Sequence, residues 1–528
     1  MSRALTLKTG TMIAVLLLSI VSLGSLDRQL KLQDDSAIYM SLAKSLYTGQ
    51  GYRNIHLIGS PPHSQYPPAF PLLLVPVMLL LGPDFLAMKL LLVALAILAL
   101  LPLAALYRDL TDEGTALLVV LLTATTHGII FFTQSIMTEI PYLLFSLLAL
   151  VWINRCARQG RWTGGSVAIA GLLISLAYLN RIIGLSLLVA AVLHVALDGR
   201  GTRLARARMA AVIGGVGALP FVLWLFYIWW ASRQVGFIPY ARYYSHFLAQ
   251  AAPSASGDGG PVMFLWKLYA SLYAYAVHAG NIIVYFTPAS PSGRLLALVP
   301  ATITFAGFLW CVRRRRTVVE YYVGAYLCAL LTLPGSRQQR YLVPLVPFIW
   351  YYFLVATGGL LRWIGERWPA RGSSPRPAEW RIAAGLAAVL LVSNVTAGAL
   401  VNVVWHGNSY YERLEAQPYR EMLSWARENT APDSVFMWDK PSLGYVLADR
   451  RAVRIPFGGP ERTLRFIQEA DVDYVVVHSG SKAARRLLPF VERYPQHLRL
   501  VHWSRDLSVY RVIGSRQGGP GGVPMPTG

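Results

Sequence analysis

Two adjacent carboxylates, Asp34 and Asp35, follow directly on the first apolar stretch of the chain, in the segment LKLQDDSAIYMSLAKSLYTGQGY (residues 30–52). A positioned carboxylate can take a proton from a hydroxyl, and such general-base catalysis contributes about 10²–10⁴-fold to a rate. The same acids could instead form a solvated turn or cap the helix predicted from AIYMSLAKSLY. The positive end of a helix dipole would help to keep them ionised. The two residues alone leave both interpretations open.

Basic side chains next to apolar runs are candidates for holding an anion. Arg181 interrupts the apolar run LAYLNRIIGLSLL, and Arg337 and Arg340 begin the stretch RQQRYLVPLVPFI. An arginine within a membrane segment costs at least about 2.5 kcal/mol unless it is paired or reaches water. Arg181 is therefore either a functional residue or an arginine that extends to the interface at a turn. For Lys89, at the start of another apolar run, an ordinary interfacial anchor is the better explanation.

Glu139 opens the apolar run in MTEIPYLLF, where an acid either stabilises the start of a helix or orients a neighbouring group. Among the histidines expected on the outer face, we consider His63, His246 and His278, which show no diagnostic spacing. A divalent metal ion held by one of them together with an acid stays open. The sequence therefore predicts no certain cofactor.

Composition places these residues in a membrane protein. Of the 528 residues, 55% are hydrophobic and only 14% are charged, whereas soluble domains carry about 25% charged residues. The three cysteines show neither metal-ligand spacing nor a disulfide framework, so we expect buried thiols at Cys156, Cys311 and Cys328. The composition therefore predicts an all-α bundle that crosses the membrane many times.

Apolar segments and arginine-rich loops alternate along the chain. Eleven segments are predicted to span the membrane: 11–26, 88–106, 115–133, 140–154, 166–180, 182–197, 209–231, 296–312, 319–333, 342–361 and 382–404. With a cytoplasmic N-terminus, nearly all cytoplasmic loops are dense in arginine, as the positive-inside rule requires. The net charge of +22 therefore mainly reflects the topology of the chain. Attraction to anionic membrane lipids is a secondary consequence of this charge. A nucleic-acid partner is not expected. The segments 166–180 and 182–197 are short, and we expect two helices that meet at an outer turn.

This topology divides the chain into a membrane module, residues 1–404, and an extracytoplasmic domain, residues 405–528. The first outer loop, residues 27–87, carries the acidic pair, and from Ser36 it predicts an amphipathic helix on the membrane surface. A second outer loop covers residues 232–295. In the tail, a helical pattern precedes the short strands SVFMWD, VDYVVVHS and LSVYRV, which predicts a small α/β domain with a disordered end from about 514.

Five motifs, in this order along the chain, resemble the GT-C superfamily of polytopic glycosyltransferases: DDSAIYMSLAKSLYTGQGY, YPPAFPLLLVPVMLLLG, FFTQSIMTEIPYLLF, LAYLNRIIGLSLL and RQQRYLVPLVPFI. They are most similar to the branch that holds the protein O-mannosyltransferases and the lipid A aminoarabinose transferase. The resemblance covers roughly residues 10 to 365. The soluble tail is less distinctive.

The resemblance implies roles for individual residues. In the family the acid of the first outer loop activates the acceptor, and the matching positions here are Asp34 and Asp35. The spacing to Tyr39 favours Asp35, as in relatives that read Asp-Glu-x-x-Tyr, although Ser36 replaces the Glu here. The resemblance further implies that basic residues meet the donor phosphate and that other side chains orient the sugar or a metal ion. The first group comprises Arg181, Arg340 and Arg337, and the second comprises Glu139, Tyr39 and Tyr66. Tyr66 stands where the aminoarabinose transferase has a Lys before the Pro-Pro pair.

The resemblance also implies an activity. The expected enzyme is a glycosyltransferase that moves a sugar from a polyprenyl-phosphate donor to an acceptor hydroxyl with inversion. The acceptor would be a glycolipid, a polysaccharide or a protein of the cell envelope. The expected location is the bacterial inner (plasma) membrane. A polytopic lipid or glycan transporter or flippase is the alternative, although no internal repeat is evident.

Overall fold

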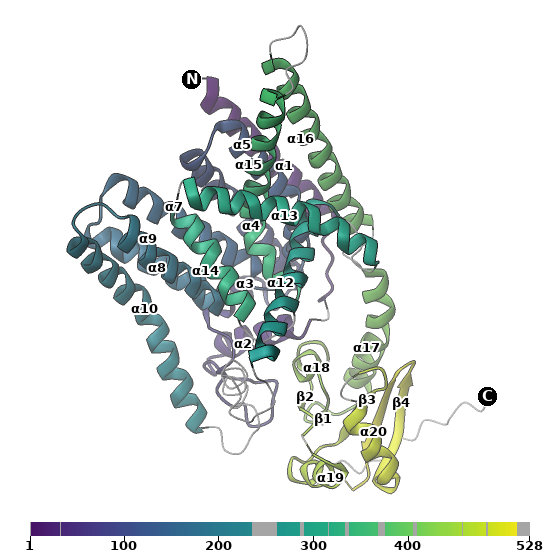
Figure 1. Cartoon of the computed structure of the whole chain (residues 1–528). Coiled ribbons are helices and arrows are strands. Elements are labelled where there is room, and N and C mark those ends of the chain that lie inside the picture. Colours follow the sequence, from purple (N-terminus) through teal and green to yellow (C-terminus); the bar gives the residue numbers. More distant parts are fainter. Residues whose placement is uncertain are drawn as a thin grey trace.

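A computed structural model of the chain describes residues 2–31, 33–234, 261–285, 290–314, 316–332, 337–367, 375–404, 409–456, 458–481 and 484–514. These residues form a large bundle of helices and a smaller part that contains a β-sheet (Figure 1). The N-terminus lies at one end of the bundle, and the sheet lies beyond the opposite end. His246 and the predicted disordered end fall outside the described residues, apart from Gly514.

Helices make up the described part of the chain up to residue 404. They are α1 (Ser2–Gly24), α2 (Asp34–Tyr47), α3 (Ala69–Leu81), α4 (Phe85–Leu110), α5 (Glu113–Thr125), α6 (His127–Thr133), α7 (Glu139–Gln159), α8 (Gly164–Asn180), η1 (Ile182–Gly184), α9 (Leu185–Asp198), α10 (Arg203–Gln234), α12 (Pro261–Ile283), α13 (Pro291–Arg314), α14 (Val318–Thr332), η2 (Gln339–Leu345), α15 (Val346–Arg367), α16 (Pro375–Ala399) and the π-helix η3 (Leu400–Val404). The predicted all-α bundle is confirmed.

Among the described residues, seven helices are long and apolar enough to cross a membrane, or eight if the bent pair α5 and α6 counts as one span. The other three segments predicted as spans are the shorter apolar helices α8, α9 with η1, and α14. The chain is therefore an integral membrane protein. A helix of 17 residues or fewer extends at most about 26 Å, slightly less than the hydrocarbon core of a bilayer, which explains why the count of long helices is lower than eleven.

The break between α8 and α9 lies where the sequence predicts it. Helix α8 ends at Asn180, and Arg181 has an extended backbone (φ −148°, ψ 125°) before η1 begins. The chain then folds back so closely that a Cβ atom on Gly184 would lie 2.7 Å from backbone atoms of Tyr178. Only glycine fits this approach, so the turn that presents Arg181 depends on Gly184.

Helix α2 begins at the acidic pair and is buried on nearly all sides. Its apolar residues pack against α3, and its serines Ser36, Ser41 and Ser45 are also buried. The predicted helix is confirmed, and it is covered by protein on nearly all sides, whereas an amphipathic pattern predicts one open face. The part of the chain after residue 404 covers the polar side of α2, a long-range contact that periodicity cannot reveal.

The C-terminal part is a five-stranded sheet with helices around it. Its elements are α17 (Ser409–Asn429), β1 (Val435–Met437), α18 (Pro441–Ala448), β2 (Arg451–Val453), α19 (Pro460–Glu469), β3 (Tyr474–His478), α20 (Ala484–Arg493), η4 (Pro495–His497), β4 (Leu498–Ser504) and β5 (Leu507–Val512). The strand order is β2-β1-β3-β5-β4, with β1 parallel to both neighbours and β5 antiparallel to both of its own. The predicted strands correspond to β1, β3 and β5. Sequence reasoning missed β2 and β4.

The sheet is joined directly to the first loop. The amide of Ala452 in β2 donates to the carbonyl of His56 (3.1 Å), and Leu57 forms a parallel bridge with Ala452. Helix α18 packs on α2, where Lys44 forms an ion pair with Asp449 at 3.3 Å. The loop that carries the acidic pair is therefore held between the bundle and the sheet (Figure 1).

Candidate active site

Four of the charged residues predicted from the sequence form two ion pairs. Asp35 Oδ2 lies 2.8 Å from Arg340 Nη1, and Glu139 Oε1 lies 2.5 Å from Arg181 Nη1. The guanidinium groups of Arg181 and Arg340 both pack on the ring of Tyr341, at 5.4 and 5.2 Å from its centroid. The ends of α2, α7, α8 and η2 thus meet at one charged cluster.

The two pairs differ in their access to ligands. The side chains of Glu139 and Arg181 are only 1% and 11% exposed, whereas those of Asp35 and Arg340 are 22% and 27% exposed. Burying two charges costs several kcal/mol per ion, so each charge of the inner pair requires the other. The outer pair can exchange partners with a bound ligand at lower cost. The buried Nε of Arg340 has no hydrogen-bond partner among the described residues, so it is a donor available to an anion.

Both oxygens of Asp35 are held by donors. Arg340 binds Oδ2, and the hydroxyl of Tyr66 donates to Oδ1 at 2.6 Å. The ring of Tyr66 lies 4.9 Å from that of Tyr39, which is buried one turn after Asp35 and contacts Phe70 edge-on at 5.1 Å. Tyr39 therefore fixes α2 and Tyr66 relative to each other, and Tyr66 contacts the acid directly.

The side chain of Asp34 lies in a different environment from that of Asp35. Its carboxylate faces the C-terminal part, where Lys440, Arg454 and Asp439 interact with it electrostatically. Its buried Oδ1 has no hydrogen-bond partner among the described residues. Burial raises the pKa of Asp34 to about 6, and the two cations oppose this rise. Adjacent residues of a helix point about 100° apart, so the two acids lie in separate environments.

Arg337 does not join the cluster. Its Nε donates to Ser271 Oγ at 3.0 Å and its Nη2 donates to the carbonyl of Lys267 at 3.4 Å, so the side chain lies along α12. Lys89 donates to Asp27 Oδ1 at 2.6 Å and to the carbonyl of Gln29 at 2.7 Å. It anchors the start of the first loop.

The described residues around the two ion pairs do not fit a metal site. Within the described ranges, no three His, Cys, Asp or Glu side chains cluster as metal ligands would. Both ring nitrogens of His63 take part in hydrogen bonds, and His278 Nε2 bonds to the carbonyl of Arg337 at 3.0 Å. Arginine already neutralises the acids of the cluster, Asp35 and Glu139. We therefore derive no step through a metal ion.

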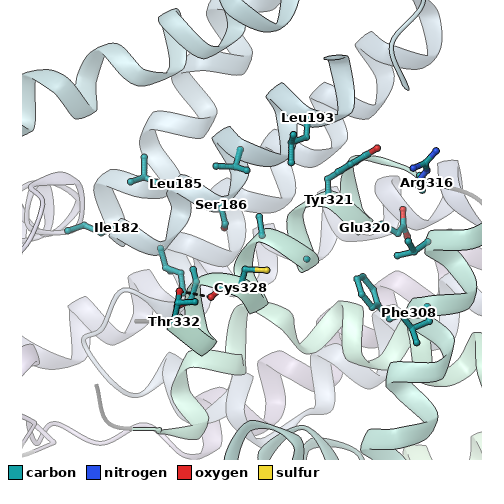
Figure 2. Close-up of a pocket in the computed structure, with 17 residues that line it drawn as sticks. Ile182, Leu185, Ser186, Leu193, Phe308, Arg316, Glu320, Tyr321, Cys328 and Thr332 are labelled. Carbon is teal, nitrogen blue, oxygen red and sulfur yellow. Dashed lines mark hydrogen bonds between the residues drawn. The ribbon is translucent and has the colours of Figure 1, made fainter. Parts of the chain in front are cut away.

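An apolar groove of about 730 Å³ lies between α9, α13 and α14 (Figure 2). Its lining is almost entirely apolar and includes Leu185, Leu193 and Phe308. Ile182 lines one end and directly follows Arg181 in the chain. The groove therefore leads along membrane helices to the backbone beside the inner ion pair.

The expectation that all three cysteines are buried is wrong for one of them. Cys156 and Cys311 are buried as predicted, but Cys328 is exposed and lines the groove. An apolar run predicts that a residue lies in the membrane, yet it does not show whether the residue faces another helix or a groove.

Some residues of the site are not identified by the sequence pattern. Tyr341 lies within the motif RQQRYLVPLVPFI, and its place directly after Arg340 is the signal that could have identified it. The neighbours of Asp34 in the tail, Lys440 and Arg454, are more than 400 positions away and carry no local signal. The groove itself is formed by three helices and is visible only in the structure.

Comparison with known proteins gives a match to one family model over part of the chain. The family model of dolichyl-phosphate-mannose-protein mannosyltransferases matches residues 65–229, a stretch that contains Tyr66, Glu139 and Arg181. It does not extend to Asp35 or Arg340. No curated protein matches the chain in sequence.

Solved structures match nearly the whole chain. ArnT from Cupriavidus metallidurans, bound to undecaprenyl phosphate, is 12% identical with a TM-score of 0.59, and the match covers 96% of this chain and 99% of that one. The archaeal oligosaccharyltransferase AglB from Archaeoglobus fulgidus, in complex with an inhibitory peptide and a dolichol-phosphate, is 13% identical with a TM-score of 0.55. That match covers 97% of this chain and 75% of AglB. The predicted resemblance is confirmed: this chain has the fold of the GT-C polytopic glycosyltransferases.

Proposed function

We propose that the protein transfers a sugar from a polyprenyl-phosphate donor to a hydroxyl of an acceptor, with inversion at the anomeric carbon. The observation that carries this proposal is the ion pair between Asp35 and Arg340, which places a carboxylate 2.8 Å from a partly exposed guanidinium group. The fold shared with ArnT, whose structure holds undecaprenyl phosphate, supports a donor of this class.

Asp35 is the base in this proposal. The acceptor oxygen attacks the anomeric carbon, its proton passes to Asp35, and the bond between that carbon and the phosphate oxygen breaks. The electron pair of that bond leaves with the polyprenyl phosphate. A single displacement of this kind needs one base and inverts the configuration. Asp34 is the weaker candidate, because it faces the C-terminal part and not the arginines.

Arg340 and Arg181 bind the donor phosphate in this proposal. A charge-assisted hydrogen bond to phosphate is worth about 1.5–3 kcal/mol, and Arg340 has a buried Nε without a partner among the described residues. When Arg340 turns to the phosphate, Asp35 Oδ2 loses a donor and can accept from the acceptor hydroxyl. Donor binding therefore prepares the base. Glu139 holds Arg181 in place, and Arg337, whose side chain lies along α12, has no part in this proposal.

The groove between α9, α13 and α14 is the proposed place of the polyprenyl tail. Its apolar lining matches an isoprenoid chain, and Ile182, which lines one end, directly follows Arg181 in the chain. A tail in the groove would therefore bring its phosphate close to Arg181. Burial of apolar surface contributes about 25 cal/mol per Å², which makes a long tail a substantial part of donor affinity.

Helix α2, which carries Asp35 in its first turn, lies at the end of the bundle that faces the sheet, opposite the N-terminus (Figure 1). With a cytoplasmic N-terminus, the reaction takes place on the extracytoplasmic side of a bacterial plasma membrane. The membrane module then comprises residues 1–404, and residues 405–528 form the extracytoplasmic domain. The acceptor is a glycolipid, a polysaccharide or a protein of the envelope.

The test uses the full-length protein in lipid vesicles with radiolabelled polyprenyl-phosphate sugars and envelope fractions as acceptors. We expect label in one acceptor fraction and release of polyprenyl phosphate. Movement of labelled donor between leaflets without a product would indicate a flippase and contradict the proposal. Glycan and lipid profiles of a deletion strain then identify the acceptor.

A further inference from the structure

We propose that His63 is a positioning residue that fixes Tyr66 and, through the Tyr66 hydroxyl, the carboxylate of Asp35. This inference rests on the proposed role of Asp35 as the base. It concerns three residues of the first loop that lie within one hydrogen-bonded chain, Asn54, His63 and Tyr66.

The hydrogen bonds of His63 determine its tautomer. The amide of Tyr66 donates to His63 Nε2 at 2.8 Å, so Nε2 carries no proton. The proton of the neutral ring is therefore on Nδ1, which donates to Asn54 Oδ1 at 2.6 Å. One imidazole thus connects the side chain of Asn54 to the backbone of Tyr66.

Burial keeps this ring neutral. His63 is 2% exposed, and its burial lowers its pKa to about 3. A charged imidazole would place an N–H opposite the amide N–H of Tyr66 and break the contact. The ring therefore keeps the same tautomer over the whole range of pH in which an envelope enzyme works.

Tyr66 is held at several points besides this bond. Tyr52 donates from its hydroxyl to the carbonyl of Tyr66 at 2.8 Å, so both polar backbone groups of Tyr66 are engaged. Its ring stacks on His63, with centroids 5.6 Å apart and an angle of 19° between the planes. The hydroxyl at the far end of the ring then lies 2.6 Å from Asp35 Oδ1.

The orientation of the Asp35 carboxylate is therefore set by Tyr66, a residue outside helix α2. Tyr66 occupies one oxygen of Asp35 and leaves the other, now paired with Arg340, for the acceptor hydroxyl. A reacting geometry off by about 1 Å can cost about 10²-fold in rate. Loss of His63 should therefore reduce turnover without removing any group that touches the donor.

The chain offers a matched control in His56. This histidine lies in the same loop, is 4% exposed, and burial likewise lowers its pKa to about 3. It forms a hydrogen bond of 3.0 Å with Ser41 Oγ and does not contact Tyr66 in any described hydrogen bond or ring pair. Substitution of His56 thus removes a buried histidine that bonds to Ser41, and its one link to the proposed chain is an electrostatic interaction with the neutral ring of His63.

The first experiment measures turnover, donor KM and thermal stability of the full-length protein in vesicles. We expect His63→Phe and Tyr66→Phe each to lower kcat about 10- to 100-fold with donor KM nearly unchanged. The double variant should lose little more than either single variant, because both act on one contact. His63→Gln can accept and donate at similar positions and should recover most of kcat. His56→Phe should lower stability as much as His63→Phe does and keep kcat.

The second experiment needs no substrate, so its outcome is independent of the proposed function. A 3-fluorotyrosine placed at position 66 reports its surroundings by ¹⁹F NMR. We expect one sharp resonance in the parent protein and in His56→Phe, and a shifted and broadened one in His63→Phe. An unchanged resonance in His63→Phe overturns the inference even if the protein transfers no sugar. Additive losses of kcat in the double variant, or full kcat in His63→Phe, overturn it as well.

Discussion

Arg340 Nη1 lies 2.8 Å from Asp35 Oδ2 although the two residues are 305 positions apart in the chain. In the function proposed above, this pair supplies the base and the phosphate-binding cation. In the proposed reaction the donor phosphate separates them. The following predictions test this arrangement.

Asp35→Asn should reduce transfer at least about 100-fold, because it preserves the shape of the side chain and removes the proton acceptor. Donor binding should stay close to that of the parent protein. Asp34→Asn is the matched control and should have the smaller effect, since Asp34 faces Lys440 and Arg454. Turnover assays on both variants decide the matter, and near-normal turnover in Asp35→Asn would show that another group is the base.

Arg340→Ala should weaken donor binding and slow transfer about 10- to 150-fold, the equivalent of about 1.5–3 kcal/mol for a bond to phosphate. Arg340→Lys should recover only part, because Lys lacks the bidentate fork. Binding of labelled donor and thermal stability are measured on the same preparations. If donor affinity stays unchanged in Arg340→Ala, this arginine does not hold the phosphate.

Arg181 requires a different design because its partner Glu139 is only 1% exposed. Arg181→Ala alone leaves a buried charge and should destabilise the protein by about 3–5 kcal/mol. The double variant Arg181→Met with Glu139→Gln removes both charges and should fold. We expect it to keep thermal stability and to bind the donor at least about 10-fold more weakly. Normal donor affinity in this variant would assign the inner pair a purely structural role.

Asp34 should make the stability of the protein depend on pH. Burial raises its pKa from 3.8 to about 6 in the folded protein, so between about pH 4 and 6 the folded state holds a proton that the unfolded chain has lost. Stability should therefore fall as the pH rises through this window, by at most about 1.4 kcal/mol per pH unit. Asp34→Asn lacks this slope, so its Tm should rise relative to the parent between pH 4 and 7. Parallel curves would contradict the buried position of Asp34.

The proposed role of the groove can be tested through Cys328. A maleimide on Cys328, which lines the groove, should compete with a polyprenyl phosphate but not with a water-soluble sugar phosphate. Cys328→Ser should bind donor normally and resist the reagent.

Reporter fusions at 410 and 317 should appear on the extracytoplasmic and cytoplasmic sides, respectively. A cytoplasmic tail would contradict the extracytoplasmic location of the site.

The sequence alone determined the class of protein, most of its helices and the types of residue at the site. These features depend on local properties: hydropathy over about 20 residues predicts a span, and arginines between apolar runs predict its direction. The break at Arg181 was predictable for the same reason, because Asn180 and Arg181 interrupt a run of apolar residues. Tail strands β1, β3 and β5 carry apolar, β-branched patterns of their own.

The pairing of these residues depends on long-range packing and is visible only in the folded protein. The choice between Asp34 and Asp35 depends on the rotation of α2, which turns the first acid to the sheet and the second to Arg340. Arg337 is three residues from Arg340, yet it lies along α12. Such pairings join segments that are hundreds of positions apart, and they depend on how helices rotate and pack, which a local pattern does not encode. The groove beside Arg181 has the same origin, since three separate helices must pack before its walls exist.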